Sequence, residues 1–242
     1  MLRIRIQLPR QQVQYYRYYD ILHDALINAW IAAGADAKDV IGASALLWNF
    51  AALGKHQGTQ GMVHTLIVST PDKTLASYLA KFESKNIRYI RAKTEELIDF
   101  SAATIRQEND PLTAEHKNLG VFLLSPLVIQ KRDSKHRRWH DKLQAVDLSA
   151  AINHRLSRLS QRKIELNVLP DSLYLRANPK HSILIKTKRM KQGKEAFVIG
   201  MQAPLLLVGS EEDLRLAWYA GIGEKNRNGF GCIGLIEQGV GR

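Results

Sequence analysis

Residues 211–231 read EEDLRLAWYAGIGEKNRNGFG and form the most distinctive pattern in the chain. The acidic residues at the start of this stretch favour the first turn of a helix, because they complement the positive end of its dipole. The sequence therefore predicts a helix over 211–219 and a strand over 229–237. The connection between them has four glycines within eleven residues, and these flank Lys225 and Arg227.

The order of these elements excludes a dinucleotide-binding loop, because such a loop follows a strand and opens a helix. Glycine permits positive φ and close approach to the backbone, so successive N–H groups can face an anion while the two cations add charge. The alternative is a hairpin with ordinary turn glycines. We expect the loop to bind phosphate through Gly221, Gly223, Lys225, Asn226, Arg227, Gly229 and Gly231.

Positive charge is concentrated in one part of the chain. The whole sequence has a net charge of +12. Residues 131–194 alone contain 17 Lys/Arg and 5 Asp/Glu, and 17 − 5 gives the same +12. A solvated face usually mixes charges of both signs, so this segment predicts a binding surface for a polyanion. Nucleic acid is favoured over an acidic membrane, because no basic amphipathic helix with bulky apolar residues stands out.

The basic segment begins with KRDSKHRRWH over 131–140 and continues into a helix predicted for 148–162. Arg155, Arg158 and Arg162 are spaced three and four apart, which places them on one helix face. Such a face can enter the deep groove of an A-form RNA stem while Trp139 stacks on a base. Each cation taken singly could equally be solvated. The predicted RNA contacts are Arg137, Arg138, Arg155, Arg158, Arg162, Lys163, Lys188 and Arg189.

Hydrophobic periodicity predicts a mixed α+β fold. A polar connection over 106–118 suggests a boundary between residues 1–118 and 119–242, each with the element order of a ferredoxin-like unit. The expected helices are 15–33, 39–53, 71–82, 148–162 and 211–219. The expected strands are 2–8, 62–69, 120–130, 172–176, 183–188, 196–208 and 229–237, with a polar loop at 54–58.

The helix that runs into GIGEKNRNGFG resembles the C-terminal signature of the CRISPR repeat-processing endoribonucleases of the RAMP superfamily. The LSPLVI run over 124–129 resembles the strand that opens the second domain of that family, and Met62–Ser69 resembles a strand that closes the first. The resemblance implies tandem ferredoxin-like (RRM-like) domains and a repeat-RNA ligand. It also implies cleavage to a 2′,3′-cyclic phosphate and a possible association of the product complex with other effector subunits.

Metal-free RNA cleavage needs a base, an acid and positive charge on the phosphate. Histidine suits both proton-transfer roles at neutral pH. His23 resembles the first-helix histidine of several subtypes of the family, and Tyr19, one turn earlier, could orient the substrate. His56 resembles the loop histidine of other subtypes, and Lys55 beside it could stabilise developing charge. Without the resemblance each is an ordinary packing or surface residue, and some family members rely on arginine instead.

The remaining features concern compartment and cofactors. The single cysteine, Cys232, cannot form an internal disulfide, and no Cys/His spacing resembles a zinc site. We expect a cytoplasmic protein without metal, cofactor or membrane segment. A non-catalytic RAMP-type subunit that only binds guide RNA is the main alternative to an endoribonuclease. A general RNA-binding module is less favoured, because strand-centre aromatic pairs are not visible.

Overall fold

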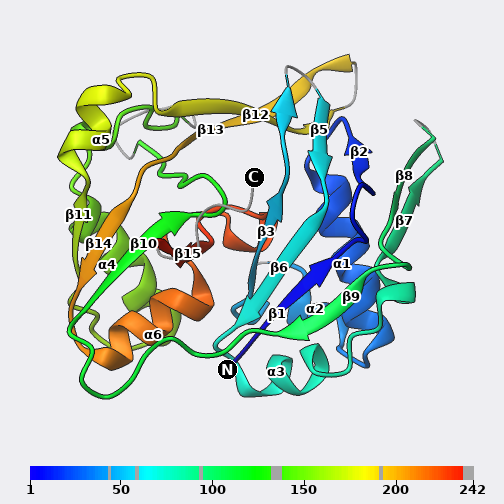
Figure 1. Ribbon diagram of the computed structural model, residues 1–242, viewed down its shortest axis with the longest axis horizontal. Coiled ribbons are helices and arrows are strands. Elements are labelled where there is room, and N and C mark those ends of the chain that lie inside the picture. Colours follow the sequence, from blue (N-terminus) through cyan, green and yellow to red (C-terminus); the bar gives the residue numbers. More distant parts are fainter. Residues whose placement is uncertain (43–44, 58–59, 93–94, 132–137, 191–192, 237–242) are drawn as a thin grey trace.

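The computed structural model describes residues 1–42, 45–57, 60–92, 95–131, 138–190 and 193–236. Two four-stranded antiparallel sheets form its frame (Figure 1). The first sheet has the order β3-β6-β1-β9, and α1 (Asp20–Ala32) and α3 (Lys73–Leu79) pack against one of its faces. Its strands are β1 (Leu2–Gln7), β3 (Asn49–Leu53), β6 (Thr65–Thr70) and β9 (Thr104–Gln107).

The second sheet repeats this topology. Its order is β11-β14-β10-β15, and α4 (Leu148–Ser160) and α6 (Glu211–Ala220) cover its inner face. If the four strands of each unit are numbered along the chain, both sheets have the strand order 2-3-1-4. This is the arrangement of a ferredoxin-like βαββαβ unit. The predicted α+β fold with two such units is confirmed. The strands are β10 (Asn118–Leu123), β11 (Asn167–Pro170), β14 (Leu205–Val208) and β15 (Ile233–Leu235).

Smaller sheets extend from this frame. A three-stranded sheet consists of β2 (Gln14–Tyr16), β5 (Gln60–Val63) and β4 (His56–Gln57), and it lies beside the long hairpin of β12 (Ser182–Arg189) and β13 (Glu195–Met201) (Figure 1). The Tyr19 N–H donates to the Lys186 carbonyl over 3.1 Å and joins α1 to that hairpin. The other elements are α2 (Ala37–Val40), β7 (Arg88–Arg91), β8 (Glu96–Asp99), α5 (Ser172–Ala177) and the 3₁₀ turns η1 (Ser84–Asn86), η2 (Leu143–Ala145) and η4 (Asn226–Asn228).

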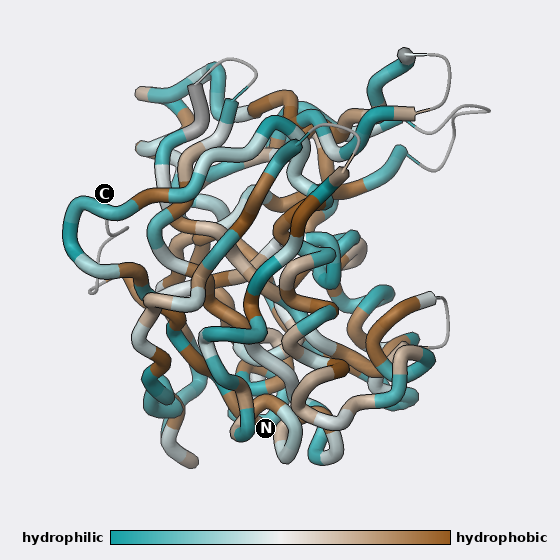
Figure 2. Tube along the Cα trace, turned by 90° about the vertical axis from the view of Figure 1, so that its right-hand side faces the viewer, coloured by the Kyte–Doolittle hydropathy of each residue, from teal (hydrophilic) through white to brown (hydrophobic). Residues whose placement is uncertain are grey.

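The two units contact each other through the outer face of the first sheet. Ala51, Leu53 and Ile67 pack on Cys232 of the second unit. The Tyr219 carbonyl at the end of α6 accepts hydrogen bonds from Asn49 and Ser69. The two donors suit the negative end of the α6 dipole. The Arg3 guanidinium lies 4.1 Å from the Trp218 ring centroid and adds positive charge at the same helix end. Figure 2 shows apolar segments gathered in the interior of the molecule. The contact between the two units is thus continuous with the hydrophobic core.

Several predicted elements differ from the structure. The helix predicted over 15–33 begins only at Asp20, because Gln14–Tyr16 form β2, and the strand predicted over 120–130 ends at Leu123. The helix predicted over 39–53 is wrong, because α2 spans only Ala37–Val40 and residues 49–53 form β3. The strand predicted over 172–176 is wrong, because Asp171 caps the N–H groups of Leu173 and Tyr174 and begins α5. The helix predicted to reach residue 162 ends at Ser160, where Gln161 adopts left-handed geometry with φ 56°.

Smaller differences concern breaks and added strands. The predicted strand over 62–69 is divided at His64 into β5 and β6, and the expected loop over 54–58 contains β4. The hairpin of β7 and β8 was not predicted. β10 begins at Asn118, next to the expected boundary, and the division into 1–118 and 119–242 remains our proposal. No helix in the described ranges is both long and apolar enough to cross a membrane.

Candidate nucleic-acid interface

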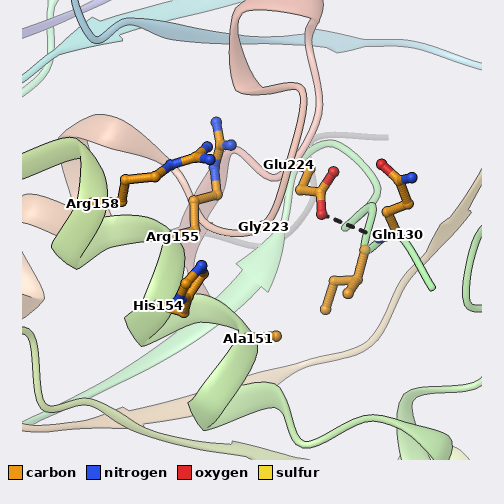
Figure 3. Close-up of a pocket in the computed structure, with 8 residues that line it drawn as sticks. Gln130, Ala151, His154, Arg155, Arg158, Gly223 and Glu224 are labelled. Carbon is orange, nitrogen blue, oxygen red and sulfur yellow. Dashed lines mark hydrogen bonds between the residues drawn. The ribbon is translucent and has the colours of Figure 1, made fainter. Parts of the chain in front are cut away.

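A cavity of about 500 Å³ lies between α4 and the glycine loop, residues 221–231 (Figure 3). His154, Arg155 and Arg158 project into it from consecutive turns of α4. Gly223 and Glu224 lie on the loop side, where Glu224 accepts a hydrogen bond from the Gln130 N–H over 3.3 Å. Three nitrogen-rich side chains therefore converge on one hollow.

Arg155 is a cation whose partner is an uncharged amide. Its Nε and Nη2 donate to Asn226 Oδ1 over 3.0 and 2.7 Å, and it forms no ion pair with a carboxylate among the described residues. The pKa of its guanidinium is lowered to about 10, mainly by burial and also by Arg158 and Arg227, while Glu224 acts in the opposite direction. At neutral pH the group stays charged, and an anion in the cavity would stabilise it.

Arg227 adds a third guanidinium to this region. Burial lowers its pKa, and its buried Nη1 has no hydrogen-bond partner in the described part of the chain. Arg158 is exposed. We name Arg155, Arg158 and Arg227 the arginine cluster. None of the three forms an ion pair with a carboxylate within the described ranges, and the planar guanidinium group suits bidentate binding of phosphate.

The glycine loop is packed against protein rather than open to solvent. A Cβ at Gly231 would lie 1.8 Å from the Ile222 carbonyl oxygen, and one at Gly229 would lie 2.4 Å from Tyr19 Cε1. Asn226 is buried and donates from Nδ2 to the Ile222 and Phe230 carbonyls. These residues shape the loop and hold Arg155. Direct phosphate contact by Gly221, Asn226, Gly229 and Gly231 stays a prediction, whereas Gly223 lies on the cavity wall.

Lys225 takes left-handed backbone geometry with φ 58° at the start of the 3₁₀ turn. Its ammonium lies 5.4 Å from the centroid of the Trp139 ring, which is a cation–π distance. Trp139, which the sequence suggested as a stacking platform for a base, therefore supports a lysine instead. Lys225 is partly exposed beside this ring.

The remaining basic residues that the sequence predicts to contact RNA fall into two groups. Arg162 binds Asp213 and lies 3.2 Å from Glu212, and Lys163 binds Glu165. Both cations therefore have carboxylate partners, and the expected RNA contacts of Arg162 and Lys163 stay predictions. Arg138, Lys188 and Arg189 are exposed and form no ion pair within the described ranges. Arg137 lies outside the described residues.

A groove between the two units carries Lys55 at its centre. On one side is a cavity of about 280 Å³ lined by Tyr16, Tyr19 and Lys55, among others. On the other is a cavity of about 390 Å³ lined by Val13, Met62 and His64 together with Lys55. Both cavities share Gly54, Lys55 and Met62, so they adjoin. We name the two cavities together the Lys55 groove.

Tyr19 connects this groove to the glycine loop. Its hydroxyl donates to the Gly229 carbonyl over 3.0 Å, and its ring packs on Phe50 and Phe230 at centroid distances of 5.9 and 5.3 Å. Burial raises the pKa of its phenol well above the usual value, so the phenol stays protonated at neutral pH. Tyr19 is thus a positioning residue of the loop and a wall of the groove.

His23 lies one helical turn after Tyr19 and is partly buried. Its ring stacks on Trp48 at 5.8 Å, and Trp48 stacks in turn on Phe50 at 6.0 Å. Its Nδ1 lies 3.4 Å from Asp24 Oδ1, and Arg91 binds both Asp24 and Asp20. Phe50 packs on Tyr19, whose hydroxyl binds Gly229, so a chain of ring contacts connects His23 to the glycine loop.

Two further histidines, His56 and His64, are associated with Lys55. His56 follows Lys55 directly and begins β4. His64 lies at the bend between β5 and β6, lines the groove, and contacts Thr65 Oγ1 through Nδ1 over 2.9 Å. Burial, followed by the nearby Arg5, lowers the pKa of its imidazole. Sequence reasoning assigned His64 to a continuous strand and a structural role, so its place in the groove was missed.

Gln202 is another groove residue that the sequence did not indicate. The only signal was indirect: Ile183 and Ile185 line the groove, and alternation along β12 leaves Leu184 exposed between them. Gln202 follows the next strand and reaches the same cavity. Within the described ranges, no three His, Cys, Asp or Glu side chains lie together as a possible metal site.

Comparison with known proteins gives one family match. The model for the C-terminal part of CRISPR associated protein Cas6 matches residues 107–235, more than half of the chain. No curated protein sequence matches significantly. Solved structures show the same fold at low sequence identity.

The product of a Cas6-related gene from Pyrococcus furiosus is 17% identical, with a TM-score of 0.65 over 98% of this chain and 99% of the other. A structure described as a RAMP protein binding different RNA substrates is 16% identical, with a TM-score of 0.64 over 97% and 99%. Cas6 of Thermus thermophilus is 12% identical, with a TM-score of 0.54 over 96% of each chain.

Proposed function

The chain belongs to the Cas6 family of CRISPR-associated proteins, and from this premise we propose that it binds CRISPR repeat RNA and cleaves it as a metal-independent endoribonuclease. The arginine cluster is the observation that carries the binding proposal. Arg155 is held by an amide rather than a carboxylate, and Arg227 keeps a buried Nη1 without a partner among the described residues. A phosphate in the cavity supplies the negative charge that this cluster lacks.

RNA cleavage in this proposal is a transesterification. A base removes the proton of a 2′-hydroxyl, and the 2′-oxygen attacks the adjacent phosphorus. The bond from phosphorus to the 5′-oxygen then breaks, and an acid gives that oxygen a proton. The products are a 2′,3′-cyclic phosphate and a 5′-hydroxyl, so no water or metal ion enters the balance.

We assign the leading proton-transfer role to His23. It lies one helical turn after Tyr19, whose hydroxyl binds the glycine loop at the Gly229 carbonyl. His56, beside Lys55, is the rival, and His64 joins it as a second candidate on the groove side. The cationic groups Lys55 and Arg227 are suited to stabilise charge on the phosphate during attack.

The alternative from the sequence, a non-catalytic RAMP-type subunit that only holds guide RNA, shares the binding surface with this proposal. Both functions need the arginine cluster, and only the nuclease needs a histidine at the scissile phosphate. Cleavage assays therefore separate the two functions, whereas binding assays test what they share.

The double variant Arg155→Ala/Arg158→Ala should bind repeat RNA more weakly and with a shallower salt dependence than the wild-type chain. Each lost phosphate contact reduces the slope of log affinity against log salt by about 0.7 to 0.9, so two contacts reduce it by roughly 1.5. Titrations between ~50 and ~200 mM salt measure this slope.

Arg162→Ala is the matched control for this experiment, because Arg162 is the same residue type close to the same helix but is neutralised by Asp213 and Glu212. Its RNA affinity should stay within about twofold of the wild-type value. Equal slopes for the double variant and the wild-type chain would show that the arginine cluster faces no phosphate.

A further inference from the structure

The hairpin of β7 and β8 lies along α1 and places an arginine among three carboxylates (Figure 1). Arg91 Nη2 lies 2.9 Å from Asp20 Oδ1 and 3.3 Å from Asp24 Oδ2. Arg91 Nη1 lies 3.6 Å from Glu96 Oε2. The Arg91 side chain is 19% exposed, so these ion pairs are partly shielded from water and salt. Together the three carboxylates hold the guanidinium at the side of the helix.

Asp24 uses its two carboxylate oxygens for different partners. Oδ2 accepts a hydrogen bond from Arg91, whereas Oδ1 lies 3.4 Å from His23 Nδ1. The His23 ring is also held on one face by Trp48, at a centroid distance of 5.8 Å. Its Nε2 forms no hydrogen bond within the described ranges, and the side chain is 18% exposed. The imidazole is therefore bound at Nδ1 and available at Nε2.

This arrangement determines which imidazole nitrogen carries the proton. A carboxylate only accepts hydrogen bonds, and a guanidinium only donates them. Asp24 therefore favours the neutral tautomer of His23 with the proton on Nδ1, which leaves the Nε2 lone pair free to accept a proton. The separation of 3.4 Å is long for a hydrogen bond, and catalytic hydrogen bonds commonly tighten only when the substrate is bound.

From this geometry we infer that Asp24, held by Arg91, is a positioning residue for His23: it keeps the imidazole proton on Nδ1 and so presents Nε2 to the RNA. The inference rests on the proposed proton-transfer role of His23 and deepens it by naming the residues that orient the ring. An acceptor at one nitrogen and the reacting group at the other is the general arrangement of a catalytic histidine.

Asp24→Asn should reverse this tautomer because of Arg91. The new side chain has a single oxygen, and the guanidinium, which can only donate, binds it. The amide NH₂ group then faces His23 Nδ1 and donates to it, so the imidazole proton moves to Nε2. In that tautomer Nε2 has no lone pair to accept the proton of a 2′-hydroxyl.

Two measurements on the full chain test the inference. Two-bond proton–nitrogen NMR correlations at about pH 9, where histidine is neutral, report the tautomer without any RNA. His23→Ala identifies the signals of that ring. The wild-type chain should carry the proton on Nδ1 and Asp24→Asn on Nε2. Single-turnover cleavage of repeat RNA by Asp24→Asn should be ~10- to 100-fold slower, approaching the effect of losing the positioned base, with an unchanged dissociation constant.

Asp20→Asn is the matched control, because Asp20 binds the same nitrogen of Arg91 and makes no contact with His23 in the described part of the chain. It makes the same change of charge one helical turn earlier. The variant should keep the proton on Nδ1 and cleave within about threefold of the wild-type rate.

The outcomes separate this positioning role from the proposed function. A wild-type His23 with its proton on Nε2 overturns the inference, whether or not the chain cleaves RNA. Wild-type cleavage by Asp24→Asn, when His23→Ala is slow, overturns it as well, and so does an equal loss in Asp20→Asn. If Asp24→Asn moves the proton but His23→Ala cleaves at the wild-type rate, the orienting role of Asp24 stands and the catalytic assignment of His23 fails.

Discussion

His23→Ala is expected to slow single-turnover cleavage of repeat RNA by ~100-fold or more, because a positioned acid or base contributes about that factor. The dissociation constant for the RNA should stay near its wild-type value, since His23 is not part of the arginine cluster. Cleavage rates at saturating enzyme, with binding measured in parallel, separate chemistry from affinity. His56→Ala and His64→Ala, measured in the same way, test the groove-side candidates.

His116→Ala is the matched control for these variants. His116 caps a turn by accepting the Thr113 N–H on Nδ1, and it lines neither the arginine cavity nor the Lys55 groove. It should cleave at the wild-type rate. If the His23, His56 and His64 variants all do the same, proton transfer by histidine is wrong and an arginine-based mechanism takes its place.

Gly231→Ala should unfold the protein or destabilise it by more than ~4 kcal/mol, the range reached when a buried clash cannot relax. Its Cβ would lie 1.8 Å from a backbone oxygen, and its φ of 70° is left-handed. Gly193→Ala is the control, because Gly193 has nearly the same φ, 75°, with no atom within 4 Å of the added Cβ. It should cost only about 1 kcal/mol. Urea denaturation of both variants measures the difference.

A small loss of stability in Gly231→Ala, close to that of Gly193→Ala, would mean that the loop backbone can move away from Ile222. The structure predicts the opposite because Gly231 is bonded on both sides of this contact. Its N–H donates to the Pro126 carbonyl, and its carbonyl accepts the Ile222 N–H. The glycines of this loop therefore act first on folding, and their effect on RNA binding follows from the position of Arg155.

The architecture was predictable where the sequence marks an element by its capping residues or by alternation of apolar and polar residues. The helix over 211–219 is confirmed as α6, and the first strand over 2–8 as β1, because capping residues and alternation mark them plainly. β3 was missed for a physical reason. Phe50 faces the helices while Ala51 faces the second unit, so both sides of the strand are buried and the alternation disappears. The alanine-rich sequence then favours a helix that tertiary pairing with β6 overrides.

The candidate site was predictable as a region and less so in its details. Charge density correctly directed attention to α4, but spacing alone treated Arg155, Arg158 and Arg162 as equivalent. The left-handed turn at Gln161 ends α4, so Arg162 lies beyond the helix. There it binds the carboxylate of Asp213, which is far away in the sequence. The Lys55 groove combines residues far apart in sequence, such as Tyr19 and Gln202. No local pattern can reveal such a cavity.

Incubation of the full chain with its repeat RNA in EDTA, with analysis of the product ends, tests the central claim most directly. We expect one cut within the repeat, with a 2′,3′-cyclic phosphate on the upstream product and a 5′-hydroxyl on the downstream product. Bound but intact RNA would contradict the endoribonuclease and support the non-catalytic RAMP subunit in its place.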